Sequence, residues 1–198
     1  MRKDVNASFT GSVRLLHRRW SVPVIGVLYR TGPQRFSALA AHLPNASRDT
    51  LTATLQDLQM GGIIRHAGDS YELTAAGALT GDAALGAVAV VRDLGIRAIA
   101  LKKWPMMVLV AIGRGSHRFN DVKAVLPGLT SGALAPALKD LEAAGLVARS
   151  VSDGYPPTVS YRLTSSGEAL FPAMDHMVRA AQAAFDEAGS VPFDSQAT

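Results

Sequence analysis

The side chains that could do chemistry are few in this sequence, and their spacing matches no catalytic or metal-binding motif. Cysteine is absent from all 198 residues, which excludes disulfides, thiolate metal sites and cysteine nucleophiles. None of the histidines has the H-x-x-x-H or H-x-x-E spacing that sets metal ligands on one helix face, so we expect neither a metal nor a cofactor. The sequence also lacks a G-x-S-x-G or phosphate-loop motif and gives no positive indication of an enzyme.

Composition places the chain among globular proteins that can bury a core. Hydrophobic residues make up 48% of it and charged residues 18%, which argues against disorder. The net charge of +4 permits nucleic-acid binding but is too scattered to demand it. The longest uncharged apolar runs are shorter than the ~18–20 residues that span a bilayer, and no signal-peptide pattern opens the sequence. We therefore expect a cytoplasmic protein.

The sequence contains one pattern twice. Trp20 recurs as Trp104, 84 residues later, and after a one-residue gap the offset becomes 83. The later matches pair Arg35-Phe36 with Arg118-Phe119, Pro44 with Pro127, Leu51, Leu55 and Leu58 with Leu134, Leu138 and Leu141, and Gly62 with Gly145. So many matches in one order indicate a duplicated domain. We expect a first domain at residues 10–95, a second at 96–188 and a flexible tail at 189–198.

Each copy has the same predicted order of elements. An apolar helix follows the tryptophan, a second helix opens at the Arg-Phe pair, and a third carries leucines at i, i+4 and i+7 before a capping glycine. Two short strands then form a hairpin. The fold class is mainly α with small β-wings, namely two tandem winged helix-turn-helix domains. Because Pro136 disfavours a helix interior, we expect the third helix of the second copy to begin at Ala135-Pro136, after a turn at 130–134.

Apolar stripes on two flanking helices predict how the copies meet. The segments Asp82–Leu94 and Phe171–Ala188 each present one apolar face that needs a partner. In a tandem protein the natural partner is the matching helix of the other copy, which gives an intrachain pseudo-dimer. Whether the chain is a monomeric pseudo-dimer or also forms a homodimer stays open.

These motifs together resemble the HxlR family of bacterial winged-helix transcriptional regulators. The second copy carries them most fully, as Lys103-Trp104, Arg118-Phe119, Leu126-Pro127, Leu138-x-x-Leu141-Glu142, Gly145-Leu146-Val147, Pro156-Pro157-x-Val159-x-Tyr161-x-Leu163-Thr164 and Gly167. The first copy keeps Arg19-Trp20, Arg35-Phe36, Leu43-Pro44 and Tyr71-x-Leu73-Thr74 but lacks the Pro-Pro segment. The resemblance implies binding of operator DNA. Family members are usually single-domain homodimers, so this chain would be a fused dimer.

The third helix of the first copy offers side chains for the major groove. With its leucines buried, Thr50 and Gln56 point outward and can contact bases, whereas Asp49 and Asp57 would oppose phosphates. In the second copy the outward positions are 132, 133, 136, 139 and 140, of which only Lys139 is basic. The predicted DNA-binding residues are Arg35, Arg48, Thr50, Gln56, Arg65, Arg118, Lys139, Arg149 and Arg162, and double-stranded DNA is the expected partner, with doubt for the second domain.

Aromatic and methionine side chains indicate a second kind of site. Packed near the central interface, they would suit a flat apolar or aromatic small molecule, although a dry core is the competing interpretation. The candidate ligand-binding residues are His17, Trp20, Tyr29, Trp104, Met107, Met174 and Met177. Two functions follow from the sequence: an HxlR-type DNA-binding regulator that responds to a small molecule, or a winged-helix scaffold that has lost DNA binding and binds, sequesters or transforms an apolar metabolite.

Overall fold

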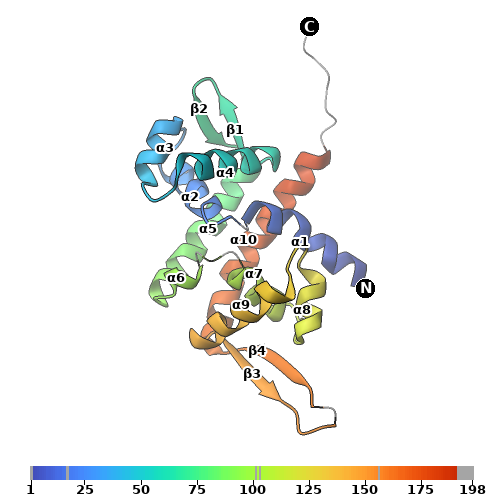
Figure 1. Cartoon of the computed structure of the whole chain (residues 1–198). Helices are drawn as coiled ribbons and strands as arrows, with labels where there is room; N and C mark the ends of the chain where they lie inside the picture. The colour runs from blue at the N-terminus through green and yellow to red at the C-terminus, as the bar shows by residue number, and fades with distance from the viewer. Residues whose placement is uncertain (1, 17, 101, 103, 156, 191–198) are drawn as a thin grey trace.

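The computed structural model describes residues 2–16, 18–100, 102, 104–155 and 157–190. Within them the chain forms two similar halves that meet along long central helices (Figure 1). The first half contains α2 (Ser21–Thr31), α3 (Phe36–His42), α4 (Arg48–Met60), β1 (Ile64–Ala67), β2 (Ser70–Leu73) and α5 (Ala75–Asp93). The second contains α7 (Pro105–Gly113), α8 (Phe119–Val125), α9 (Ser131–Ala143), β3 (Val147–Val151), β4 (Val159–Leu163) and α10 (Ser165–Ser190). The predicted order of three helices and a hairpin is confirmed in both copies.

The third helix of each half is defined by the same local signals. Ser47 caps α4 by accepting a hydrogen bond from the Thr50 N–H at 3.3 Å, and Thr130 caps α9 through the Ala133 N–H at 3.2 Å. Beyond the other end, Gly62 and Gly145 take φ of 70° and 65°, a conformation that favours glycine. Between these signals the leucines of the i, i+4, i+7 stripe are buried in the core.

The prediction that α9 begins at Ala135-Pro136 is wrong. The helix begins at Ser131, and Pro136 is its sixth residue. The Thr130 carbonyl already accepts the Leu134 N–H at 2.9 Å, so the first turn is closed before the proline. Burial of Leu134 and Leu138 holds the segment helical despite the missing N–H of Pro136. Because Gly132, four residues earlier, is exposed, water can satisfy its carbonyl.

The start of each long helix is locked against the base of its wing in the same way. Thr74 donates its hydroxyl to the Gly62 carbonyl at 2.5 Å and accepts the Gly77 N–H at 3.0 Å, capping α5. Thr164 does the same at α10, with the Gly145 carbonyl at 2.5 Å and the Gly167 N–H at 3.2 Å. A Cβ atom at Gly77 or Gly167 would overlap a backbone carbonyl, so both positions require glycine. Each wing is therefore rigidly coupled to a central helix.

The halves pack through α5 and α10, which confirms that the flanking helices are partners. Both helices begin earlier than predicted, and α10 includes Gly189 and Ser190, while residues 191–198 of the predicted tail lie outside the described part. By length and composition α5 could cross a membrane, and in the structure it packs along α10. The predicted division at residues 95 and 96 falls between α5 and α6 (Arg97–Ala100) and stays a prediction.

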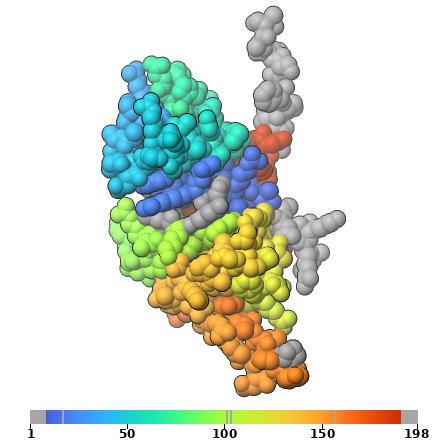
Figure 2. Space-filling view, viewed as in Figure 1, coloured from blue at the N-terminus to red at the C-terminus, as the bar shows by residue number. Residues whose placement is uncertain are grey.

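The sequence patterns did not predict α1 (Arg2–Leu16), which packs along α10. Figure 1 is viewed close to a pseudo-twofold axis: α4 and α9 exchange places across the centre, and the wings β1–β2 and β3–β4 point to opposite ends. In the second half, the position equivalent to α1, before the first helix of the unit, is occupied by the single turn of α6. In Figure 2 both third helices are exposed on the same face, one on each side of the centre. The chain thus presents its two third helices in the arrangement that two copies of one domain would have in a symmetric dimer.

Candidate nucleic-acid interface

The exposed face of α4 is polar. Thr50 and Gln56 are both exposed, as predicted from the leucine stripe on the opposite face, and the Thr50 hydroxyl lies 2.8 Å from the Ser47 hydroxyl. Thr52 and Gln59 are exposed as well, and the sequence prediction missed them. Their signal was present, because 52, 56 and 59 follow the i, i+4, i+7 spacing of one helix face. Hydroxyl and amide groups of this kind can donate to and accept from base edges in the major groove.

One aspartate at the same position of each third helix forms an ion pair with a cation behind that helix. Asp57 has an exposed side-chain fraction of only 17% and is ion-paired with Arg18. Asp140 occupies the matching position of α9, and its carboxylate lies 2.7 Å from Lys102 Nζ. In both halves the cation lies two residues before the tryptophan that precedes the first helix of the unit. These pairs anchor the third helices and neutralise the carboxylates, which weakens the expectation that Asp57 repels DNA phosphates. Of the two aspartates on α4, Asp49 is the one that is exposed.

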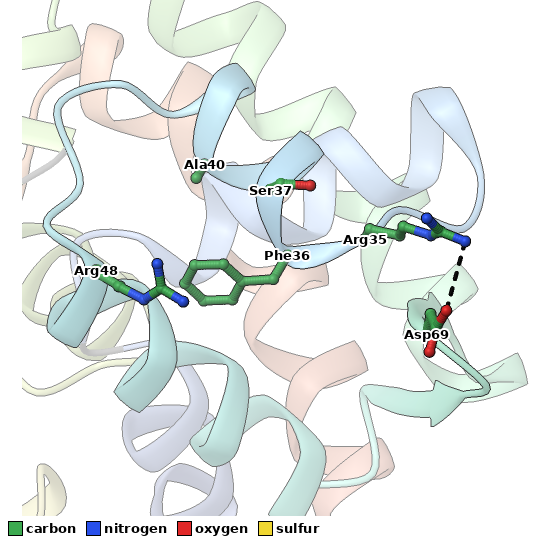
Figure 3. Close-up of a pocket in the computed structure, with 6 residues that line it drawn as sticks. All are labelled: Arg35, Phe36, Ser37, Ala40, Arg48 and Asp69. Atoms are coloured by element: carbon green, nitrogen blue, oxygen red, sulfur yellow. Dashed lines mark ion pairs between the residues drawn. The ribbon is translucent and has the colours of Figure 1, made fainter.

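The arginines predicted to bind DNA in the first half are engaged with other side chains, as Figure 3 shows for Arg35 and Arg48. Arg35 Nη2 lies 3.5 Å from an Asp69 carboxylate oxygen at the tip of the wing. The guanidinium of Arg48 lies over the Phe36 ring, 5.2 Å from its centroid, and both border an open surface pocket between α3 and α4. On the wing, Arg65 pairs with Glu72 at 2.6 Å across the two strands. Phosphate binding by Arg35 and Arg65 therefore has to compete with nearby carboxylates.

The basic residues predicted to bind DNA in the second half have no such competitors. Arg118, Lys139, Arg149 and Arg162 are all exposed, and none forms an ion pair with a residue of the described part of the chain. Arg118 is the N-cap of α8, and Lys139 lies on α9. The other two lie at neighbouring register positions of the wing, Arg149 on β3 opposite Tyr161 and Arg162 on β4 opposite Ala148. By contrast the exposed face of α9 carries Gly132, Ala135 and Pro136, which have no polar side-chain atoms. Among the exposed positions of this face, Lys139 has a side chain that could contact a base edge, so this half offers charge with little base-reading capacity.

The structure separates the predicted ligand-binding residues. Trp104, Met107, Met174 and Met177 are buried in the core where α7 packs on α10. Trp20 is only partly buried, and His17 lies outside the described residues. Tyr29 is at the surface, where its hydrogen bond to Asp82 raises its pKa. Two open surface pockets lie at α3–α4 and at the end of α4, and none of the predicted ligand-binding residues that the structure describes lines either one, so the apolar site stays a prediction.

Comparison with known proteins gives a consistent result. A family model described as "HxlR-like helix-turn-helix" matches residues 15–78 and 99–188, one segment in each half. The transcriptional regulator YvaP of Bacillus subtilis is 37% identical over 76 residues, which are 38% of this chain and 70% of that protein. A regulator of Methanothermobacter thermautotrophicus is 36% identical over 73 residues, 37% of this chain and 56% of its own length. YtfH of Escherichia coli is 38% identical over 66 residues, 33% and 52% of the two chains. All three are described as helix-turn-helix-type transcriptional regulators.

Two solved structures are similar over about half of this chain. A regulator of the MarR family from Enterococcus faecalis has a TM-score of 0.38 at 24% identity, covering 53% of this chain and 87% of its own. An HxlR-family factor from Thermoplasma volcanium has a TM-score of 0.34 at 26% identity, covering 56% and 85%. Each is a regulator according to its description.

A repeated unit of three helices and a wing, with both third helices on a common face, defines a tandem winged helix-turn-helix protein. The family model covers most of the sequence, with a match in each repeat. The chain belongs to the HxlR-like helix-turn-helix family and is a DNA-binding transcriptional regulator.

Proposed function

We propose that this regulator binds duplex DNA in the cytoplasm through the face that carries α4 and α9. The observation that supports this most strongly is the polar surface of α4, where Thr50, Gln56 and Gln59 are exposed above fully buried leucines. The wing β1–β2 extends beside this helix, as a winged helix requires for contact with the backbone. A single chain supplies two such units, which a single-domain relative would obtain by dimerisation.

Each side chain in the first half has a distinct proposed role. The Gln56 amide can pair with both the N6 and N7 edge atoms of adenine, and Thr50 can contact a base or a thymine methyl group. Arg35 is the N-cap of α3 and Arg48 is the first residue of α4. Phosphates at the edge of the groove would lie beside these two helix starts. Arg48 approaches them from a defined position because Phe36 holds its guanidinium.

An anisotropy titration with a labelled duplex from the region upstream of the protein's own coding sequence tests this proposal. We expect nanomolar binding that weakens steeply with salt, by about 10³-fold or more between 50 and 200 mM for six or more phosphate contacts. A matched control is Arg92→Ala on α5, which removes one exposed positive charge outside the third helices and wings and should leave the affinity unchanged. Absence of binding at low salt would overturn the proposal and favour the scaffold that has lost DNA binding.

Regulation by an apolar small molecule has weaker support. Its basis is the concentration of Trp104, Met107, Met174 and Met177 between α7 and α10, but these side chains are already packed in the core. A ligand there would have to displace core side chains, and methionine is the residue best able to adjust to this. Thermal-shift measurements with a panel of planar apolar compounds test it: a saturable rise in Tm supports a site, and no shift with any compound argues against one.

A further inference from the structure

The two halves differ in what they present at the reading position. The face of α4 exposes Thr50, Thr52, Gln56 and Gln59. At the positions 83 residues later, α9 has Ala133, Ala135, Lys139 and Glu142, and Glu142 is half-buried. The alanines and Pro136 can touch a thymine methyl group but cannot form a hydrogen bond with a base edge. The base-reading capacity of the pseudo-dimer is therefore concentrated in the first half.

The available positive charge shows the opposite bias. In the first half Arg35 and Arg65 each lie against a carboxylate, at 3.5 Å from Asp69 and 2.6 Å from Glu72. In the second half Arg118, which corresponds to Arg35, is exposed without an ion-pair partner in the described residues, and so are the wing arginines Arg149 and Arg162. Ala148 occupies the position of Arg65. The change is direct on the second wing strand, where Arg162 occupies the position of Glu72, one residue after Tyr161 and Tyr71 respectively.

We propose that the operator of this protein is asymmetric. This inference rests on the proposed DNA-binding function and assigns different tasks to the halves. The first half reads bases through α4, and the second holds the sugar-phosphate backbone of the neighbouring half-site through Arg118, Lys139, Arg149 and Arg162. Phosphate contacts supply affinity and register, whereas base contacts supply specificity, so the two tasks can be separated. A homodimer must present the same side chains twice, but a fused pseudo-dimer does not.

Selection of binding sites from a random duplex library, followed by hydroxyl-radical footprinting, tests this proposal. We expect one block of base preferences with no inverted copy, and backbone protection over two regions about one helical turn apart. Gln56→Ala should relax the preference at one base pair by about 5- to 150-fold. Lys139→Ala should weaken binding to all selected sequences by a similar factor and reduce the salt slope by about 1. Because both side chains are exposed, neither substitution should disturb folding.

Each alternative outcome identifies the part that fails. Two inverted blocks of equal preference would overturn the asymmetric operator and leave the DNA-binding function intact. One block with protection confined to it would show that the second half does not hold DNA, which also overturns the inference. Binding without any sequence preference would remove base reading from α4 and overturn it as well. No binding to any duplex at low salt would instead overturn the proposed function itself.

Discussion

At the residue scale, the two halves exchange a large and a small side chain at one packing contact. In the first half Tyr29 of α2 packs against Gly81 of α5, where a Cβ atom would come within 2.5 Å of the tyrosine ring. In the second half the glycine is on the other helix: Gly113 of α7 faces Phe171 of α10, and a Cβ atom would overlap that ring. Tyr29 and Gly113 are equivalent by the offset of 84. Each interface therefore keeps one aromatic ring and one glycine although their positions are reversed.

This exchange predicts that Gly113→Ala destabilises the protein. The new methyl group would force the Phe171 ring to move, at a cost of about 1–3 kcal/mol in the free energy of unfolding, measured by urea denaturation. Gly86→Ala on α5 is the matched control, because nothing lies within 4 Å of its added Cβ and a helical alanine should stabilise by about 0.5–1 kcal/mol. Equal effects of the two substitutions would contradict the proposed contact.

Two aspartates of α4 should also differ in their effect on DNA binding. Asp49 is exposed in the first turn, whereas Asp57 is largely buried and ion-paired with Arg18. Asp49→Asn should therefore raise the affinity for DNA severalfold. Asp57→Asn should not, since Arg18 already compensates the Asp57 charge and the substitution would leave the Arg18 guanidinium unpaired behind the helix. Parallel anisotropy titrations on one duplex measure both changes. A larger gain from Asp57→Asn would show that this carboxylate faces the DNA.

At the element scale, α9 is a helix maintained by its core contacts against an unfavourable residue. Thr130 caps it, Leu134, Leu138 and Leu141 are buried, and Pro136 interrupts the backbone hydrogen bonds on the exposed side. A proline in a helix interior costs about 3 kcal/mol relative to alanine. The helix has therefore kept its packing role in the second half, although Pro136 occupies its exposed side and has no group that could form a hydrogen bond with a base.

Pro136→Ala should raise the free energy of unfolding by about 1–3 kcal/mol, because it restores an N–H donor and removes the ring from an exposed helix position. The reciprocal substitution Ala53→Pro, at the matching position of α4, should destabilise by at least as much. Urea denaturation curves of the two variants provide the measurement. A loss of stability in Pro136→Ala would contradict a helix that begins at Ser131.

Local patterns predicted most elements but not the contacts between distant segments. The leucine stripes, capping glycines and strand pairs identified the winged-helix units because these signals lie within a few residues of one another. In contrast, α1 depends on Gln182, whose side-chain oxygen accepts the Gly11 and Ser12 N–H groups at 2.9 and 3.1 Å. The Arg18–Asp57 pair is likewise non-local. Such contacts require the tertiary structure, so the sequence alone did not reveal them.

On the scale of the whole molecule, fusion of the halves has allowed each to acquire its own contacts. The second half contains a largely buried ion pair between Arg114 and Asp175, at 2.6 Å, and Arg179 also contacts Asp175. The repeat offset is 84 residues before the wing and 90 residues after it, as between Thr74 and Thr164. By these offsets the positions of Arg114 and Asp175 are occupied by Arg30 and Leu85 in the first half, so the pair cannot form there. The Arg114 guanidinium also lies 4.6 Å from the Phe9 ring of α1, a helix that packs mainly on α10. Packing and surface chemistry have thus diverged together around a common pseudo-dimer core.

The stoichiometry of the DNA complex tests the account most directly. Light scattering coupled to size-exclusion chromatography, on a duplex recovered by selection, should show one 20.8 kDa chain per duplex, because a single chain already contains both α4 and α9 on one face. Two chains per duplex would contradict the view that the fused halves replace a dimer. Failure to form any complex at low salt would contradict DNA binding as the function of this fold.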